Sequence, residues 1–144
     1  MLYADTSCLL KVLRPEPASG DVLRAIGRED TVVVSTLAEL ETLVQLKSAW
    51  TGGLLTREQW RHAEARFNAL RNNPPYEFRH VPAAIFRTGL RQHRNSGDKH
   101  CRSLDRLHLA AMEELDISRL MTHDEQQAQA ATELGFEVIC PGRV

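Results

Sequence analysis

Four acidic residues stand where predicted strands end or predicted helices begin: Asp5, Glu39, Asp105 and Asp124. Asp5 directly follows a short apolar run, Asp124 comes just after the run of residues 120–122, and Glu39 and Asp105 fall in the first turn of predicted helices. In open α/β sheets, ligands bind at the carboxyl ends of the strands, where loops diverge and helix N-termini point into a crevice. We therefore expect the four acids to converge on one pocket.

Like charges gathered in one pocket repel one another, by about 4 kcal/mol for two carboxylates 4 Å apart at an effective dielectric near 20. A protein that collects acids in this way commonly holds a cation between them. Oxygen ligands without a set of cysteines or histidines select a hard ion, so we predict Mg²⁺ or Mn²⁺ as the cofactor. Such ions make a hydroxide from water and neutralise charge on a phosphoryl group. The acids therefore indicate metal-assisted cleavage of a phosphodiester.

Each acid also has an ordinary structural interpretation. Glu39 could complete a capping box, Asp124 could cap a helix, and Asp105 suits the dipole of a first helical turn. Asp5 is the exception, because an acid that ends a buried strand has no comparable structural task. Glu41 lies about 200° around the helix from Glu39, so only one of them can face the pocket. We expect that one to be Glu39.

The elements that must position these acids alternate along the chain. Short apolar runs separated by helical patterns are typical of β-α units and a mainly parallel sheet. The predicted strands are residues 1–4, 31–34, 119–122 and 136–140, with 77–81 a weaker candidate. The predicted helices include 56–70, 104–115 and 126–134, and a turn at 50–55 joins two helices. The helix that carries Glu39 is expected to bury an apolar stripe made of Leu37, Leu40, Val44 and Leu46.

The 144-residue chain has the usual size of one domain, and we expect a single α/β domain over residues 1–144. Hydrophobic residues make up 42% and charged residues 26%, which excludes disordered, collagen-like and disulfide-dense classes. The apolar runs are too short for a membrane span or a signal peptide, so no membrane partner is predicted. Three cysteines without metal-like spacing are expected to be thiols of a cytoplasmic protein: Cys8, Cys101 and Cys140.

The net charge of -1 conceals an uneven distribution along the chain. Residues 57–106 carry 11 basic and 5 acidic side chains, a net +6, whereas residues 107–144 carry 2 and 7, a net -5. Arginine accounts for 15 of the 18 basic residues, and its planar guanidinium can hold a phosphate through two hydrogen bonds. The middle stretch is thus compatible with a phosphate-bearing partner, although a solvated helix face is the ordinary explanation of such a charge run.

Four segments resemble, in order and spacing, the PIN-domain ribonucleases, and most closely the VapC-type toxins of toxin–antitoxin operons: YADTSCLLK, VVSTLAELETL, RSLDRLHLAAM and LMTHDEQQAQAATELGFEVICPG. The resemblance covers roughly residues 1–50 and 101–142 and is most specific at LDRLHLA and at THD followed by LGFEV. Residues 51–100 match nothing specific. The resemblance implies a three-layer α/β/α fold with a mainly parallel five-stranded sheet, and an endoribonuclease that uses Mg²⁺ or Mn²⁺.

The resemblance also implies roles for individual residues. By position, the catalytic and metal-binding acids are Asp5, Glu39, Asp105 and Asp124. Small hydroxylic residues near the metal are Thr6, Ser7 and Thr122. We assign RNA contacts to three arginines of the positive stretch: Arg87, Arg91 and Arg106. The implied partners are an RNA substrate, a cognate antitoxin whose tail inserts a basic side chain among the acids, and a second copy of the chain in a homodimer.

Two departures from the family pattern and several alternatives accompany this resemblance. Arg106 replaces a small residue and Glu125 a basic or apolar one. His108 lies one turn after Asp105, but on this striped helix we expect a packed, hydrogen-bonded histidine. A haloacid-dehalogenase phosphatase would need a second aspartate two residues after Asp5, which the sequence lacks. A PIN-like module that has lost catalysis, and a PIN nuclease of RNA processing without an antitoxin, remain open.

Overall fold

The structure is a computed structural model that describes residues 1–143. In chain order its elements are β1 (Leu2–Ala4), α1 (Thr6–Leu13), α2 (Ser19–Ile26), β2 (Val32–Ser35), α3 (Thr36–Thr51), α4 (Arg57–Ala69), a 3₁₀ turn η1 (Leu70–Asn72), β3 (Tyr76–Arg79), α5 (Ile85–Asn95), α6 (Ser103–Glu114), β4 (Arg119–Met121), α7 (Glu125–Glu133) and β5 (Glu137–Ile139). Strands and helices alternate through most of the chain, as the sequence pattern predicts.

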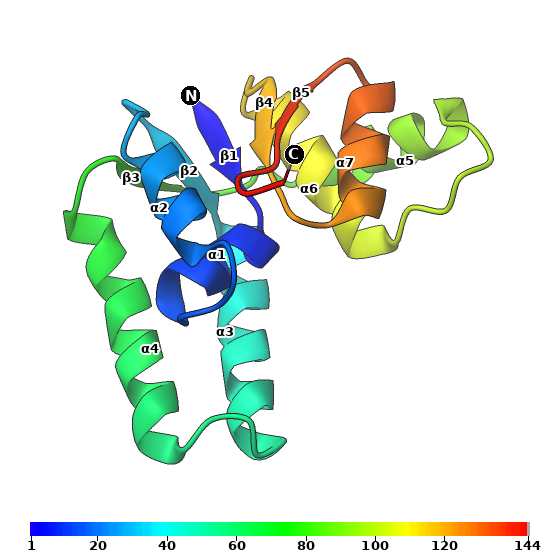
Figure 1. The fold of residues 1–144 in the computed structure, drawn as a ribbon. Helices are drawn as coiled ribbons and strands as arrows, with labels where there is room; N and C mark the ends of the chain where they lie inside the picture. Colours follow the sequence, from blue (N-terminus) through cyan, green and yellow to red (C-terminus); the bar gives the residue numbers. More distant parts are fainter. Residues whose placement is uncertain (144) are drawn as a thin grey trace.

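The five strands form one parallel sheet in the order β3-β2-β1-β4-β5 (Figure 1). The three central strands are short and buried, and continuous apolar runs such as Val32–Val34 suit strands covered on both faces. The chain passes outward from β1 to β3 and then returns to the other side of β1 as β4. The strand order therefore reverses between β1 and β4, and a crevice is expected where their carboxyl ends diverge.

Helices cover both faces of the sheet, which gives the three layers that the family resemblance implies. One buried cluster joins α1, α2, α3 and α4 to one face of the sheet through residues such as Leu9, Val22 and Phe67. A second cluster joins α5, α6 and α7 to the other face through residues such as Leu109 and Ala130. The prediction of a three-layer α/β/α fold with a five-stranded parallel sheet is therefore confirmed.

Helices α3 and α4 form a long hairpin that extends beyond the sheet (Figure 1). Trp50 and Trp60 stack with ring centroids 4.3 Å apart across the two helices, close to the turn. Gly53 occupies the turn with φ +84°, a conformation that costs glycine little. Thr56 and Gln59 form the predicted capping box at the start of α4. The turn and the cap of this hairpin are thus as the sequence predicts.

The other predicted elements agree in part with the structure. All five predicted strands are present, with ends shifted by one or two residues, and the weakest candidate is β3. Gly135 ends α7 with φ +84°, as expected for a left-handed residue. The sequence analysis missed α2 and α5. No helix in residues 1–143 is long and apolar enough to cross a membrane.

Candidate active site

A pocket of about 680 Å³ opens at the carboxyl ends of β1 and β4, where the strand order reverses. Its lining includes Glu16, which pairs with Lys11, and four further carboxylates from four segments of the chain: Asp5, Glu41, Asp105 and Asp124. Three of these are acids that the sequence analysis selected. The fourth is Glu41 in place of Glu39.

Asp5 is the most buried acid of the pocket and is held by a dense set of hydrogen bonds. Its Oδ1 accepts from the Ser7 backbone N–H at 2.9 Å and from the Ser7 hydroxyl at 2.5 Å, and its Oδ2 accepts from the Thr122 hydroxyl at 2.5 Å. Burial raises the pKa of Asp5 above its ordinary value, and the hydrogen bonds from Ser7 and Thr122 oppose that rise. Asp5 is also the N-cap of α1, so our argument that it has no structural task is wrong.

Asp124 lies at the end of the neighbouring strand and likewise caps a helix. Its Oδ1 accepts from the Gln127 backbone N–H at 3.1 Å at the start of α7. The Thr122 hydroxyl, which donates to Asp5, also accepts from the Asp124 backbone N–H at 3.0 Å. One buried hydroxyl therefore ties the two strand-end acids together, and the capping interpretation and the pocket interpretation of Asp124 are compatible.

The three predicted hydroxylic residues all lie at this pocket, but they do different things. Ser7 and Thr122 donate to Asp5, as described above. The Thr6 hydroxyl oxygen is buried in the pocket lining and makes no hydrogen bond of ordinary geometry within the described chain, although it lies close enough to Glu41 to help lower the pKa of that carboxylate. It is therefore a polar atom that a bound ion, water or substrate could satisfy.

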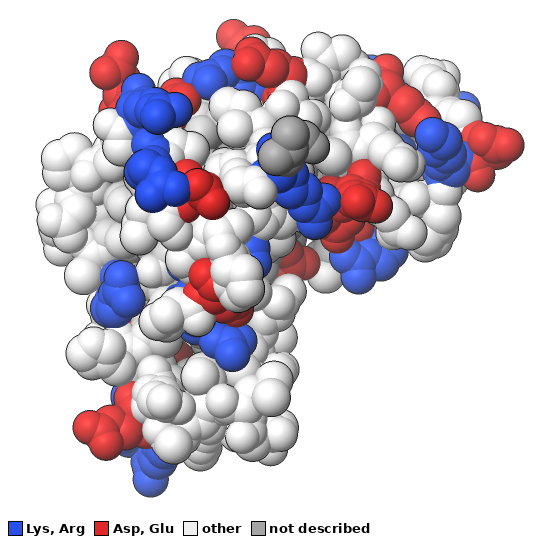
Figure 2. Space-filling view, viewed as in Figure 1, with Lys and Arg blue, Asp and Glu red and all other residues white. Residues whose placement is uncertain are grey.

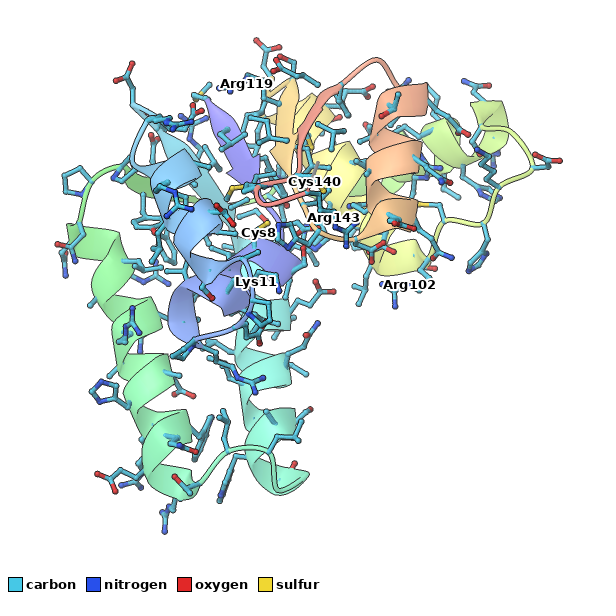
Figure 3. All side chains as sticks on the ribbon, in the orientation of Figure 1. Cys8, Lys11, Arg102, Arg119, Cys140 and Arg143 are labelled. Atoms are coloured by element: carbon cyan, nitrogen blue, oxygen red, sulfur yellow. The ribbon has the colours of Figure 1, made fainter. Side chains whose placement is uncertain are left out.

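Asp105 lies in the first turn of α6 and pairs with the guanidinium of Arg102, which is the N-cap residue of that helix. The Arg102 Nε lies 3.0 Å from Asp105 Oδ2, and an Arg102 Nη lies 3.4 Å from Asp124 Oδ2. Arg102 is largely exposed and lies at the lower edge of the α6–α7 lobe (Figure 3). Its guanidinium thus bridges two of the four acids. The sequence analysis missed Arg102, although its place three residues before Asp105 fits an i, i+3 ion pair.

Glu39 lies outside the pocket, which corrects our choice between the two glutamates of α3. Its carboxylate pairs with Arg71, whose guanidinium lies over the Phe78 ring. The error began with the buried stripe that we assigned to α3, because Leu40 and Val44 are 63% and 54% exposed. The buried face of α3 keeps Leu46 of the predicted stripe but otherwise carries the smaller residues Ala38, Thr42 and Ala49. That rotation turns Glu41 toward the pocket.

His108 is packed and hydrogen-bonded, as predicted, and it also reaches the pocket. It is 1% exposed, and its Nδ1 lies 2.7 Å from the Tyr3 hydroxyl. Its Nε2 lies 3.3 Å from Glu41 Oε1, and this hydrogen bond lowers the pKa of Glu41 below its ordinary value although burial opposes it. Glu41 is therefore held from the α6 side of the pocket.

The three arginines assigned to RNA lie away from the acids. The pocket lining contains no residue of α5, which carries Arg87 and Arg91, and Arg91 pairs with Glu113. Arg106 is buried between α5 and α6, 3.5 Å from Gln92 Oε1, so it does not present its guanidinium at the pocket. As RNA contacts, Arg87 and Arg91 stay a prediction. Besides Arg102, the pocket lining contains the basic side chain of Lys11, which lies on the opposite side of the pocket (Figure 3).

Part of the positive charge of residues 57–106 is paired with acids from outside that stretch. Arg71, Arg91 and Arg102 each contact such a carboxylate. Figure 2 accordingly shows Lys and Arg intermingled with Asp and Glu on the visible face, which is hollowed between the α3–α4 hairpin and the lobe of α5, α6 and α7. The net charge of a segment therefore overstates the positive charge available to a ligand.

Comparisons with known proteins agree with this fold. Residues 2–133 match the PIN domain family model. Ribonuclease VapC46 of Mycobacterium tuberculosis is 31% identical over 142 residues, 97% of each chain.

Two solved structures share the fold. Mycobacterium tuberculosis VapC20, a sarcin-ricin loop cleaving toxin, has a TM-score of 0.74 at 18% identity and covers 98% of this chain and 100% of its own. A toxin–antitoxin complex from Klebsiella pneumoniae has a TM-score of 0.68 at 14% identity and covers 100% of both chains. The family match over most of the chain and the similarity to VapC46 along nearly its whole length lead to one conclusion: the chain belongs to the PIN-domain family, among its VapC-type members.

Proposed function

We propose that this VapC-type chain is a divalent-cation-dependent endoribonuclease that acts as the toxin of a toxin–antitoxin pair. The observation that carries the proposal is the gathering of Asp5, Glu41, Asp105 and Asp124 in one pocket at the point where the strand order reverses. Such a concentration of negative charge is unfavourable without a compensating cation. The similarity to a curated VapC ribonuclease supports RNA as the substrate.

The residues of the pocket fit a hard divalent cation in their chemistry. All four acids offer carboxylate oxygens, and the buried Thr6 hydroxyl adds an unpartnered oxygen. In the described part of the chain, no three Asp, Glu, His or Cys side chains are already grouped so that they could hold a metal ion. Arg102 accounts for part of this, because its guanidinium lies across Asp105 and Asp124. Cation binding therefore requires Arg102 to withdraw.

In the proposed mechanism, Asp5, Glu41, Asp105 and Asp124 hold Mg²⁺ or Mn²⁺. When bound, such a cation supplies an activated water and neutralises charge on the phosphoryl group. The chain itself orients the ligands: Ser7 and Thr122 fix both oxygens of Asp5, and the cap of α7 fixes Asp124. Arg102, once released from the carboxylates, and Lys11 on the opposite rim carry the donors that can hold phosphate oxygens of an RNA strand.

Cleavage of RNA tests this proposal directly. The purified chain should cut total RNA with Mg²⁺ or Mn²⁺ and not with EDTA, and mapping the new 5′ ends should give defined sites. Asp5→Asn should abolish cleavage while the protein remains folded, because asparagine still caps α1. Cleavage at the wild-type rate in EDTA or by Asp5→Asn would refute the metal site.

The two glutamates of α3 form a matched pair for the choice of ligands. Glu41→Gln should reduce both cleavage and Mn²⁺ affinity, because it removes a carboxylate from the pocket. Glu39→Gln removes one carboxylate two residues away and loses only its contact with Arg71, so its cleavage should stay near the wild-type level. The opposite result would return the ligand role to Glu39.

The cognate antitoxin is the second part of the proposal. A solved structure with this fold is a toxin–antitoxin complex, which supports an antitoxin partner here. Co-expression with the product of the neighbouring small reading frame should restore growth and give a complex that survives purification. Cleavage of RNA without any copurifying antitoxin would instead favour a nuclease of RNA processing. The RNA substrate and the antitoxin place the chain in the cytoplasm in this proposal.

We also propose a homodimer, formed through α5. Phe86 and Leu90 lie one turn apart on this helix, and both are more than half exposed. Together with Leu107 of α6 they line a surface pocket. A two-fold interface would cover this apolar surface with the same surface of a second copy. Light scattering should give a dimer for the wild type and a monomer for the double variant Phe86→Ser and Leu90→Ser; a monomeric wild type would refute the dimer.

A further inference from the structure

A buried row of polar side chains runs from the end of β2 to the acidic pocket. The Tyr3 hydroxyl lies 2.7 Å from Ser35 Oγ and 2.7 Å from His108 Nδ1, and His108 Nε2 lies 3.3 Å from Glu41 Oε1. Ser35 and Tyr3 are fully buried, and His108 is almost fully buried. Buried polar groups are costly unless they are hydrogen-bonded, and this row satisfies each member through the next. Its last two members, His108 and Glu41, line the pocket.

The hydrogen bonds of the row assign the tautomer of the imidazole. The Ala38 backbone N–H donates to Ser35 Oγ at 3.0 Å, which leaves the Ser35 hydroxyl hydrogen for Tyr3. The Tyr3 hydroxyl hydrogen then goes to His108 Nδ1, so the proton of a neutral imidazole sits on Nε2 and is donated to Glu41. The reverse tautomer would place a nitrogen lone pair opposite the carboxylate and leave the Ser35 hydrogen unused.

The position of His108 in α6 gives this hydrogen bond a geometric consequence. Asp105 and His108 are three residues apart, so their side chains lie on the same face of α6. Glu41 belongs to α3, whose core lies on the other face of the sheet, and its side chain has several rotatable bonds. The hydrogen bond from His108 therefore fixes a carboxylate of α3 relative to a carboxylate of α6.

We propose that His108 is a positioning residue that holds Glu41 beside Asp105, so that the two carboxylates can bind the same divalent cation. The inference rests on the proposed function, because it concerns the same pocket. His108 does not touch the substrate or the cation in this account. It acts through Glu41, and Tyr3 acts through His108 by fixing its tautomer. Outer partners of this kind typically change metal affinity by about 10- to 100-fold when they are removed.

Two substitutions of His108 separate positioning from simple packing. His108→Asn keeps a polar group at the level of Nδ1 but is too short to reach Glu41, and His108→Gln places an amide N–H at the level of Nε2. Titration of the full-length chain with Mn²⁺ by calorimetry should show about 10- to 100-fold weaker binding for the asparagine variant. The glutamine variant should bind within a few-fold of the wild type. Equal affinity of wild type and His108→Asn would overturn the proposal.

A double-mutant cycle shows whether His108 acts through Glu41. In the Glu41→Gln background, His108→Asn should weaken Mn²⁺ binding no further, because the carboxylate that it positions is absent. A further loss as large as in the wild-type background would also overturn the proposal. If His108→Asn does not fold, as judged by its thermal melt, Tyr3→Phe replaces it. That variant keeps the ring but frees the tautomer, and it should weaken Mn²⁺ binding in the wild-type background only.

The wild type and Asp5→Asn keep this test distinct from the proposed function. If the wild type binds no Mn²⁺, or if Asp5→Asn binds it equally well, the cation site fails and the inference fails with it. If the wild type binds Mn²⁺ in dependence on Asp5 and the His108 and Tyr3 variants all match it, the cation site stands and the positioning role alone is refuted.

Discussion

Removal of Arg102 should tighten cation binding, although it takes a side chain away from the site. In the structure its Nε lies 3.0 Å from Asp105 Oδ2 and one Nη lies 3.4 Å from Asp124 Oδ2. A divalent cation and this guanidinium compete for the same carboxylates, so the protein must break both ion pairs before the cation can use them. Arg102→Gln should remove that competition and leave a side chain of similar length.

The size of the effect follows from how exposed these ion pairs are. Arg102 is 62% exposed, so each pair is worth about 0.2–1 kcal/mol after screening by solvent rather than the larger value of a buried pair. Two pairs give about 0.4–2 kcal/mol. Because about 1.4 kcal/mol corresponds to a factor of ten, Arg102→Gln should bind Mn²⁺ about 2- to 30-fold more tightly. The free energy of unfolding of the metal-free variant should fall by a similar amount.

Calorimetric titration with Mn²⁺ and urea unfolding in EDTA measure the two effects on the same samples. Arg91→Gln is the matched control, since Arg91 is 55% exposed and pairs with Glu113 outside the pocket. The control loses one ion pair where Arg102→Gln loses two, so it should lose about half as much stability and leave Mn²⁺ affinity unchanged. Unchanged or weaker Mn²⁺ binding by Arg102→Gln would refute the competition between the guanidinium and the cation.

Three further predictions concern stability. Asp124→Asn should change the unfolding free energy of the metal-free protein by less than about 1 kcal/mol, because asparagine still caps α7. The variant should nevertheless lose most of the stabilisation by Mg²⁺, which for the wild type is about 2.7 kcal/mol at 100 times Kd. Equal Mg²⁺ responses of the two proteins in thermal melts would contradict this. The hydrogen bond from Arg119 lowers the pKa of Glu29. The wild type should therefore be more stable than Glu29→Gln by about 0.5–1 kcal/mol at pH 7, and this advantage should disappear as the pH falls below about 4.5. An advantage that persists at pH 3 in urea titrations would exclude the ion pair as its source. Gly89→Ala should raise the unfolding free energy by about 0.5–1 kcal/mol, since a Cβ there meets the nearest atom, Arg106 Cγ, at an ordinary 3.6 Å; a lower urea midpoint would show that α5 and α6 cannot accept the methyl group.

The fold was predictable wherever apolar residues marked the buried positions. The three central strands are short and mostly apolar, so their pattern was clear, whereas β3 alternates with charged residues and was the weakest candidate. Helix α5 was missed because its buried face is Ile85, Thr88, Gly89 and Gln92, which mixes small and polar residues. Gly89 faces α6, with the Ala110 Cβ 3.8 Å from the place that a Cβ of residue 89 would take. A count of apolar side chains cannot detect a buried helix face that is made largely of small and polar residues.

The candidate site shows the same limit at the level of single residues. Asp5, Asp105 and Asp124 follow from chain position alone, since the ends of parallel strands and the starts of the following helices meet at one edge. The choice between Glu39 and Glu41 depends on the rotation of α3, which the small residues Ala38 and Ala49 set. The contact of Arg102 with Asp105 is an i, i+3 pair that the sequence could have indicated, but its contact with Asp124 depends on the tertiary fold.

The helix caps formed by Asp5 and Asp124 also determine how much side-chain conformational entropy these two residues can still lose when a ligand binds. Each carboxylate is already immobilised, Asp5 through both oxygens and Asp124 through the oxygen that accepts from Gln127. Their rotamer freedom is lost during folding, so binding need not remove it again. Glu41 has a longer side chain, and the hydrogen bond from His108 restricts it in the same way. The free energy of folding therefore contributes to affinity in this pocket, and a mutation that loosens the start of α1 or α7 would weaken binding without touching a ligand.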